Sequence, residues 1–262
     1  MVLEQYFKVA WVERKFHSFY IALIYSIIGI LSARLIFPND VGLMSLAFIS
    51  ILLIPSLGVL LQLEENIEIR EKKLSLKMLF KDHTDIMKVY FFVFFGCFLI
   101  YLLIGVIFPT SFIGDLFFPQ FRAANIVGSA ISLNAFQELV INNSVVFVVA
   151  FILSFIYGSG AILFLVWNAS VWGIAFGFTA RQIVLSGTLT GFYTYFFYFP
   201  HLIIEGTAYL FAAVVGGVVS KAVLREPLFS RKFTHLVTDA LLLLGIGLFL
   251  VIIGGIIEAQ FF

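Results

Sequence analysis

Residues 89–108 read VYFFVFFGCFLIYLLIGVIF, a run of 20 residues without a charged side chain. A helix of about 20 apolar residues is long enough to cross the hydrocarbon core of a bilayer. Comparable, mainly apolar runs cover residues 18–37, 42–63, 144–167 and 236–257. Because the runs recur along the whole chain, we predict an all-α, polytopic transmembrane protein with a single membrane domain, residues 18–262.

The composition supports this class. Hydrophobic residues make up 62% of the 262 residues and charged residues 12%, whereas a soluble domain carries roughly 25% charged residues. The formal net charge of +1 provides no basic field for nucleic acid. Cys97 is the one cysteine, which excludes an intrachain disulfide and a thiolate metal cluster. We expect no cofactor, no bound metal and no nucleic-acid partner.

Lys and Arg predict the orientation, because cytoplasmic loops retain positive charge during insertion. With the amino terminus in the cytoplasm, every Lys and Arg except Arg34 and Arg122 falls on that side, and Arg181 is counted there. The carboxyl terminus is then expected outside the cell.

Residues 172–220 form a less regular stretch. With this charge distribution, residues 183–220 must begin and end on the cytoplasmic side. Two tight spans there would give seven spans in total. A re-entrant helical hairpin with its turn at Pro200 and His201 would instead give five spans. Both architectures remain open at this point.

The amino-terminal segment, residues 1–17, is predicted to form an amphipathic helix on the cytoplasmic leaflet. Its apolar side chains recur at helical spacing, with charged residues elsewhere around the helix: Leu3, Tyr6, Phe7, Ala10 and Trp11.

His201 and Glu205 are the strongest candidates for a functional polar pair. They are four residues apart, so on a helix that begins after Pro200 they share one face and can bond or neutralise each other. Ionisable groups inside a membrane are costly, so the pair is either a proton, ion or substrate site or a satisfied pair that fixes helix packing. Two such groups alone do not make a zinc site.

Other residues are candidates for helix ends and helix packing. Asn168 closes the predicted fourth span, where its amide would cap the helix or bond to another helix. Gly216 and Gly217 continue the helix after Pro200, where small residues permit close backbone approach.

The carboxyl-terminal half resembles the stage II sporulation protein M family of prokaryotic membrane proteins. The residues that carry the resemblance, in order and spacing, are Asn143, Asn168, Gly173, Pro200, His201, Glu205, Ala208, Gly216 and Gly217. Leu202 and Ala169 stand where the family usually has glycine.

The resemblance implies a protein of the prokaryotic plasma membrane without enzymatic activity, which organises or anchors a membrane complex. In spore-forming bacteria the namesake works with cell-wall hydrolases during engulfment. The expected partners are the lipid bilayer, other membrane or cell-envelope proteins, and a second copy of the chain.

Two other functions fit parts of the sequence. An interfacial amino-terminal helix and a charged loop over residues 64–88 are similar to exporter permeases, in which that loop would dock a cytoplasmic ATPase. An intramembrane metal-dependent peptidase would use Glu64, His201 and His235. We disfavour the peptidase, because Glu64 and His235 lie at the cytoplasmic ends of their spans, whereas a base and metal ligands must meet around one water.

Overall fold

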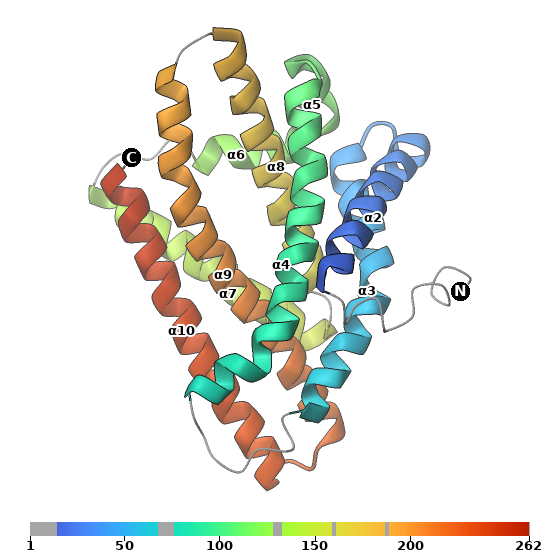
Figure 1. Cartoon of the computed structure of the whole chain (residues 1–262), viewed down its shortest axis with the longest axis vertical. Coiled ribbons are helices and arrows are strands. Elements are labelled where there is room, and N and C mark those ends of the chain that lie inside the picture. The colour runs from blue at the N-terminus through green and yellow to red at the C-terminus, as the bar shows by residue number, and fades with distance from the viewer. Residues whose placement is uncertain (1–14, 68–75, 128–132, 159–160, 187–188, 262) are drawn as a thin grey trace.

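The computed structural model describes residues 15–67, 76–127, 133–158, 161–186 and 189–261 (Figure 1). Within these ranges the chain forms helices and no strand, which confirms the predicted all-α class. The helices are α2 (Lys15–Ile36), α3 (Val41–Ile67), α4 (Leu76–Ile107), α5 (Thr110–Leu116), α6 (Phe118–Val127), α7 (Leu133–Tyr157), α8 (Ala161–Ser186), α9 (Leu189–Arg225) and α10 (Arg231–Phe261).

Six of the described helices are long and apolar enough to cross a membrane. The candidate spans are Phe16–Ile36, Met87–Ile107, Val140–Tyr157, Ile162–Leu185, Ile203–Arg225 and Phe233–Ile257. A shorter apolar stretch, Val41–Pro55, lies in α3. Of the predicted amphipathic helix, residues 1–14 lie outside the described ranges, and residues 15–17 are the first residues of α2.

The predicted span over residues 144–167 is wrong, because two helices share these residues. α7 ends at Tyr157, and α8 begins at Ala161. Gly158 has a φ of 64°, the left-handed conformation that often ends a helix and that glycine adopts without steric cost. The long apolar run therefore contains a turn between two helices.

The re-entrant hairpin with a turn at Pro200 and His201 is also wrong. α9 runs without interruption from Leu189 to Arg225, with Pro200 inside it. Proline is tolerated within membrane helices because neighbouring helices and local adjustments satisfy the freed backbone groups. The stretch over residues 172–220 is instead divided between α8 and α9.

Parallel pairs of helices define the topology. α2 and α4 run in the same direction, because Phe16 packs on Phe92, with ring centroids 5.0 Å apart, while Gly96 faces Ala22. α4 and α8 are also parallel, because Gly173 faces Tyr101 while Gly177, one turn later in α8, faces Gly105, one turn later in α4. α3 therefore returns the chain between α2 and α4.

Arg181 lies at the opposite end of the bundle from the predicted one. Its Nη1 donates a hydrogen bond to the carbonyl oxygen of Ile107, at the carboxyl end of α4, over 3.2 Å. Lys88 lies near the other end of the same span. Arg181 therefore lies at the same end of the bundle as Ile107 and at the opposite end from Lys88.

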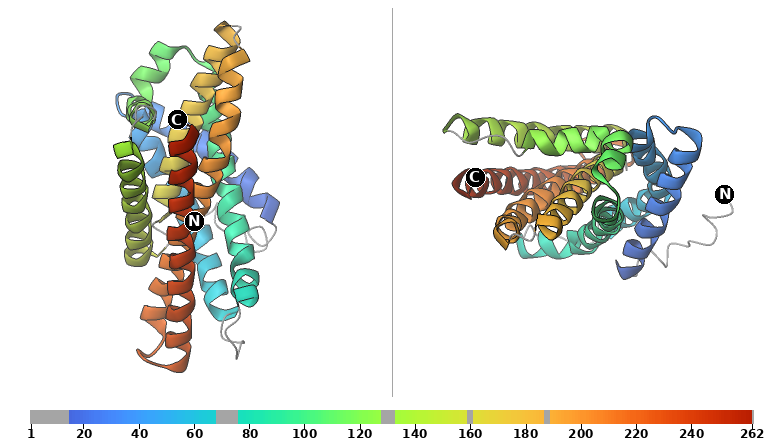
Figure 2. Two further views of the ribbon diagram at one scale, coloured as in Figure 1. Left: turned by 90° about the vertical axis from the view of Figure 1, so that its left-hand side faces the viewer. Right: turned by 90° about the horizontal axis from the view of Figure 1, so that it is seen from above.

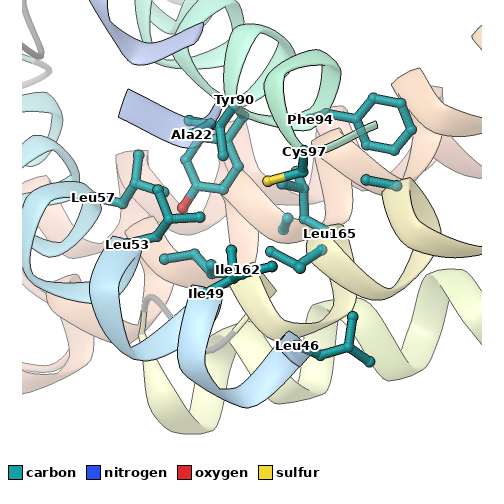
Figure 3. Close-up of a cluster of buried hydrophobic side chains, with 14 of the residues drawn as sticks. Ala22, Leu46, Ile49, Leu53, Leu57, Tyr90, Phe94, Cys97, Ile162 and Leu165 are labelled. Carbon is teal, nitrogen blue, oxygen red and sulfur yellow. The ribbon is translucent and has the colours of Figure 1, made fainter. Parts of the chain in front are cut away.

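α9 is the most enclosed of the candidate spans. In the 18-residue apolar window of Ile203–Arg225, 82% of the residues are buried, compared with 33% in that of Phe233–Ile257 and 22% in Val140–Tyr157. Seen from above, α2 and α3 lie at one end of the bundle and α7 and α10 at the other (Figure 2). Side chains from α2, α3, α4 and α8 form a buried apolar cluster that includes Ala22, Ile49, Tyr90, Cys97 and Leu165 (Figure 3). Glu205 and Ser220 of α9 therefore lie inside a tightly packed part of the protein.

Candidate functional site

Glu205 is a buried carboxylate on α9, with 5% of its surface exposed. Its Oε1 accepts a hydrogen bond from Nδ2 of Asn143 on α7. Asn143 is also buried, with 7% exposed. An amide donor stabilises either the charged or the neutral form of a carboxyl group, and leaving this group without a donor would be costly. Two residues that the sequence singled out separately therefore form one contact between helices.

Gly254 on α10 packs against the side chain of Glu205. A Cβ atom added there would lie 2.7 Å from Cγ and 3.2 Å from Oε1 of Glu205. Real Cβ atoms do not approach other atoms so closely, so the absence of a side chain at Gly254 makes room for the carboxylate. We call Asn143, Glu205 and Gly254 the polar junction of α7, α9 and α10.

His201 precedes Glu205 by one turn of α9, as the sequence predicted. Its side chain lies outside what the structure describes, so the predicted pairing with Glu205 stays a prediction. Pro200, the residue before His201, is exposed.

Asn168 does not close a span, contrary to the prediction, and within the described part of the chain its amide bonds to its own helix and not to another. It lies within α8, and its Nδ2 donates to the carbonyl oxygen of Phe164 in the same helix over 2.9 Å. The prediction failed because the helix boundary had been placed ten residues too late along the chain, at Trp167 instead of Tyr157.

Gly173 lies within α8 rather than at the end of a span, and it packs against α4. A Cβ atom there would lie 2.8 Å from the carbonyl oxygen of Phe98 and 2.6 Å from Cβ of Tyr101. One turn later, Gly177 packs against Gly105 and Leu102. Gly173 and Gly177 form a G-x-x-x-G pattern, which is a known signal for close helix contact in membranes and which sequence reasoning missed.

Gly216 has the packing role that the sequence predicted. A Cβ atom there would lie 2.6 Å from the carbonyl oxygen of Phe151 on α7. At the same crossing, the hydroxyl of Ser154 donates to the carbonyl oxygen of Ala213 on α9. Gly217 is buried in the next position of α9. The polar junction and the contact at Gly216 thus join α7 to α9 at two places along the helices.

The two histidines of the peptidase hypothesis are far apart. His235 and Asp239 lie 3.6 Å apart in the first turns of α10. Gly254, which faces Glu205, comes 19 residues after His235 in α10, a distance of about 28 Å along the helix axis at 1.5 Å per residue. Because α9 runs antiparallel to α10, His201 is further still from His235, so these residues cannot share one metal ion.

A small apolar recess of about 40 Å³ lies between α4, α8 and α9. Four phenylalanines of α4 line one wall: Phe91, Phe94, Phe95 and Phe98. Trp172 and Gly206 separate it from a smaller recess that reaches Asn168. The hydroxyl of Thr207 at the recess bonds to the carbonyl oxygen of Ile203 over 2.7 Å, so it is used within its own helix.

Residues 89–261 match the family model described as Stage II sporulation protein M. The chain belongs to this family. The match confirms the predicted resemblance and extends it from the carboxyl-terminal half to the start of the α4 span. No curated protein and no solved structure matches the chain.

The family match covers every residue of the polar junction and of the α4–α8 glycine contact. α2 and α3 lie outside it, although they pack against α4. The part of the chain that belongs to the family therefore contains both sets of close helix contacts.

Proposed function

We propose that this member of the stage II sporulation protein M family is a non-enzymatic membrane protein that organises or anchors a complex in the prokaryotic plasma membrane. The observation that carries the proposal is the polar junction. Its carboxylate is bound by Asn143 and enclosed by Gly254, so its described contacts hold three helices together. A rigid bundle of this kind suits a protein whose task is to hold partners in place.

The proposal includes seven membrane crossings, with α3 added to the six candidate spans. Because α2 and α4 are parallel, a crossing by α3 is needed to join them. Of the basic residues in the described helices, Arg34, Arg122 and Arg181 then lie at one end, and the others lie at or toward the opposite end: Lys15, Lys77, Lys81, Lys88, Lys221, Arg225, Arg231 and Lys232. The positive-inside rule places the latter end in the cytoplasm, with the amino terminus inside and the carboxyl terminus outside.

Copurification from the native membrane tests the proposal. The full chain, tagged and expressed at its natural level, should retain one or a few membrane or cell-envelope proteins at a fixed ratio. A matched sample carrying Gly177→Leu, which disrupts the α4–α8 contact, should lose them. Recovery of the chain alone, in a lipid environment that preserves its fold, would refute the proposal.

A permease subunit driven by a separate ATPase is the second candidate. The observation in its favour is that α4 begins at Leu76, eleven residues before its candidate span begins at Met87, with Lys77 and Lys81 in that extension. Such a basic helical extension could dock a cytoplasmic ATPase. An ATPase copurifying in a fixed ratio, with hydrolysis stimulated by the chain, would favour this candidate over the first.

A further inference from the structure

The turn between α9 and α10 displays a large apolar side chain in an unusual backbone conformation. Phe229 is 89% exposed and has a φ of 64°. Leu228 beside it is 62% exposed. The turn is closed by a hydrogen bond from the amide of Ser230 to the carbonyl oxygen of Pro227 over 3.0 Å. It is the lowest point of the molecule in Figure 1.

A phenylalanine is an unexpected residue at this position. Among the described residues other than glycine, Phe229 has the only positive φ. A turn with a positive φ at its third residue usually carries glycine or asparagine there, because a Cβ atom is sterically unfavourable in this region. The strain is not offset by burial within the chain, since the ring is exposed. A binding surface outside the chain would explain both features.

The adjoining spans fix the depth of the turn. The candidate span of α9 ends at Arg225, and that of α10 begins at Phe233. From the length and composition of these two spans, we expect residues 226–232 close to the boundary between hydrocarbon and water. Aromatic side chains are enriched at this boundary because an apolar ring can enter the headgroup region.

Basic residues surround the two apolar side chains. Arg225 and Arg231 are exposed on either side of the turn, and Lys221 and Lys232 occupy neighbouring positions in α9 and α10. Clustered Lys and Arg near a membrane attract anionic headgroups. Apolar side chains flanked by basic residues are the pattern of segments that bind an anionic leaflet.

We propose that Leu228 and Phe229 insert into an anionic phospholipid leaflet, and that the exposed Arg225 and Arg231 bind its phosphate groups. The inference goes beyond the organising role proposed above and does not depend on it. A protein partner on the same turn is the competing occupant, and the experiment separates the two.

The first test uses a spin label on the full chain in vesicles. Cys97→Ala removes the native thiol, and Phe229→Cys or Arg231→Cys supplies the labelling site. In phosphatidylcholine vesicles with phosphatidylglycerol, we expect the ratio of oxygen collisions to nickel-chelate collisions to be several-fold higher at position 229 than at position 231. The ratio at position 229 should fall without phosphatidylglycerol. Free access of the nickel chelate to position 229, or shielding from both reagents, would overturn the proposal in favour of water or of a protein contact.

A second test measures the thermal unfolding of the unmodified protein and of two variants at position 229, in nanodiscs that contain phosphatidylglycerol. Phe229→Gly relieves the positive φ but removes the ring, whereas Phe229→Leu keeps an apolar side chain and the strain. We expect the glycine variant to unfold at a lower temperature than the leucine variant. A higher unfolding temperature for the glycine variant would show that the ring makes no stabilising contact, and would overturn the proposal.

Discussion

Two contacts hold the family region together by different means. Between α4 and α8, Gly105, Gly173 and Gly177 bring the two backbones together. Between α7, α9 and α10, Gly216 and Gly254 also allow close approach, but buried side-chain hydrogen bonds add to the contact. The first contact depends on dispersion forces between closely packed atoms, and the second also depends on a donor for a buried carboxylate.

The difference predicts opposite sensitivities. The α4–α8 contact has no space for added atoms, so it should fail when a side chain is enlarged. The polar junction should fail when a polar group is removed, because the remaining partner stays buried without a bond. Substitutions of both kinds can therefore separate the two contacts.

The largest expected effect is all or none, and it tests whether α9, the central helix of the second contact, crosses the membrane. With Cys97→Ala as background, Ser186→Cys marks the end of α8 and Ser230→Cys the start of α10. A membrane-impermeant thiol reagent should label position 186 in intact cells and leave position 230 unlabelled, because the basic end is expected inside. Labelling of both positions to the same extent would contradict the crossing of α9.

The next largest effect is expected at Gly177, where a side chain would collide with the backbone of α4 at Leu102 and Gly105. Gly177→Leu should lower the free energy of unfolding by about 3 kcal/mol or more, since overpacking forces the helices apart. Gly245→Leu on α10 is the matched control, because nothing lies within 4 Å of a Cβ atom there. Equal unfolding curves for the two variants in a denaturant titration would show that the α4–α8 contact tolerates separation.

Smaller effects are expected at the polar junction. Asn143→Ala and Glu205→Ala should each destabilise the protein by about 1–3 kcal/mol, because each leaves a buried partner without its bond. The double variant should cost less than the two single effects together, and a double-mutant cycle in the same titration measures this coupling. Additive losses would mean that the two side chains act independently.

The smallest effect should come from Ser154, whose hydroxyl joins α7 to the backbone of α9. Ser154→Ala should cost about 0.6 kcal/mol, the average for hydrogen bonds between membrane helices. A loss as large as that of Asn143→Ala would mean that a bond to the Glu205 carboxyl group contributes no more than a bond to a backbone carbonyl.

The apolar runs predicted the helical class, because a bilayer requires long apolar helices. The divisions between helices were harder to predict. Gly158 ends α7 inside an apolar run, and Pro200 does not end α9, so neither composition nor proline marks the true boundaries. The error at Gly158 displaced Asn168 and Gly173 from the middle of α8 to the end of a span.

The polar junction could be predicted only in part. The sequence singled out Asn143 and Glu205 as separate positions, but they are 62 residues apart, and periodicity does not determine which helices meet. Gly254 carried no signal, since only the neighbouring carboxylate explains it. The α4–α8 contact was predictable in principle from the G-x-x-x-G spacing of Gly173 and Gly177.

The pairing of α4 with α8 has a consequence for biosynthesis. Gly105 and Gly177 are 72 residues apart in the chain, and α7 crosses between their helices. At a translation rate of about 5–20 residues per second, the ribosome needs roughly 4–14 s to make the intervening segment. During that interval the glycine face of α4 lacks its native neighbour, so a chaperone or an insertase that shields nascent membrane helices would act on this protein most usefully between the emergence of α4 and that of α8.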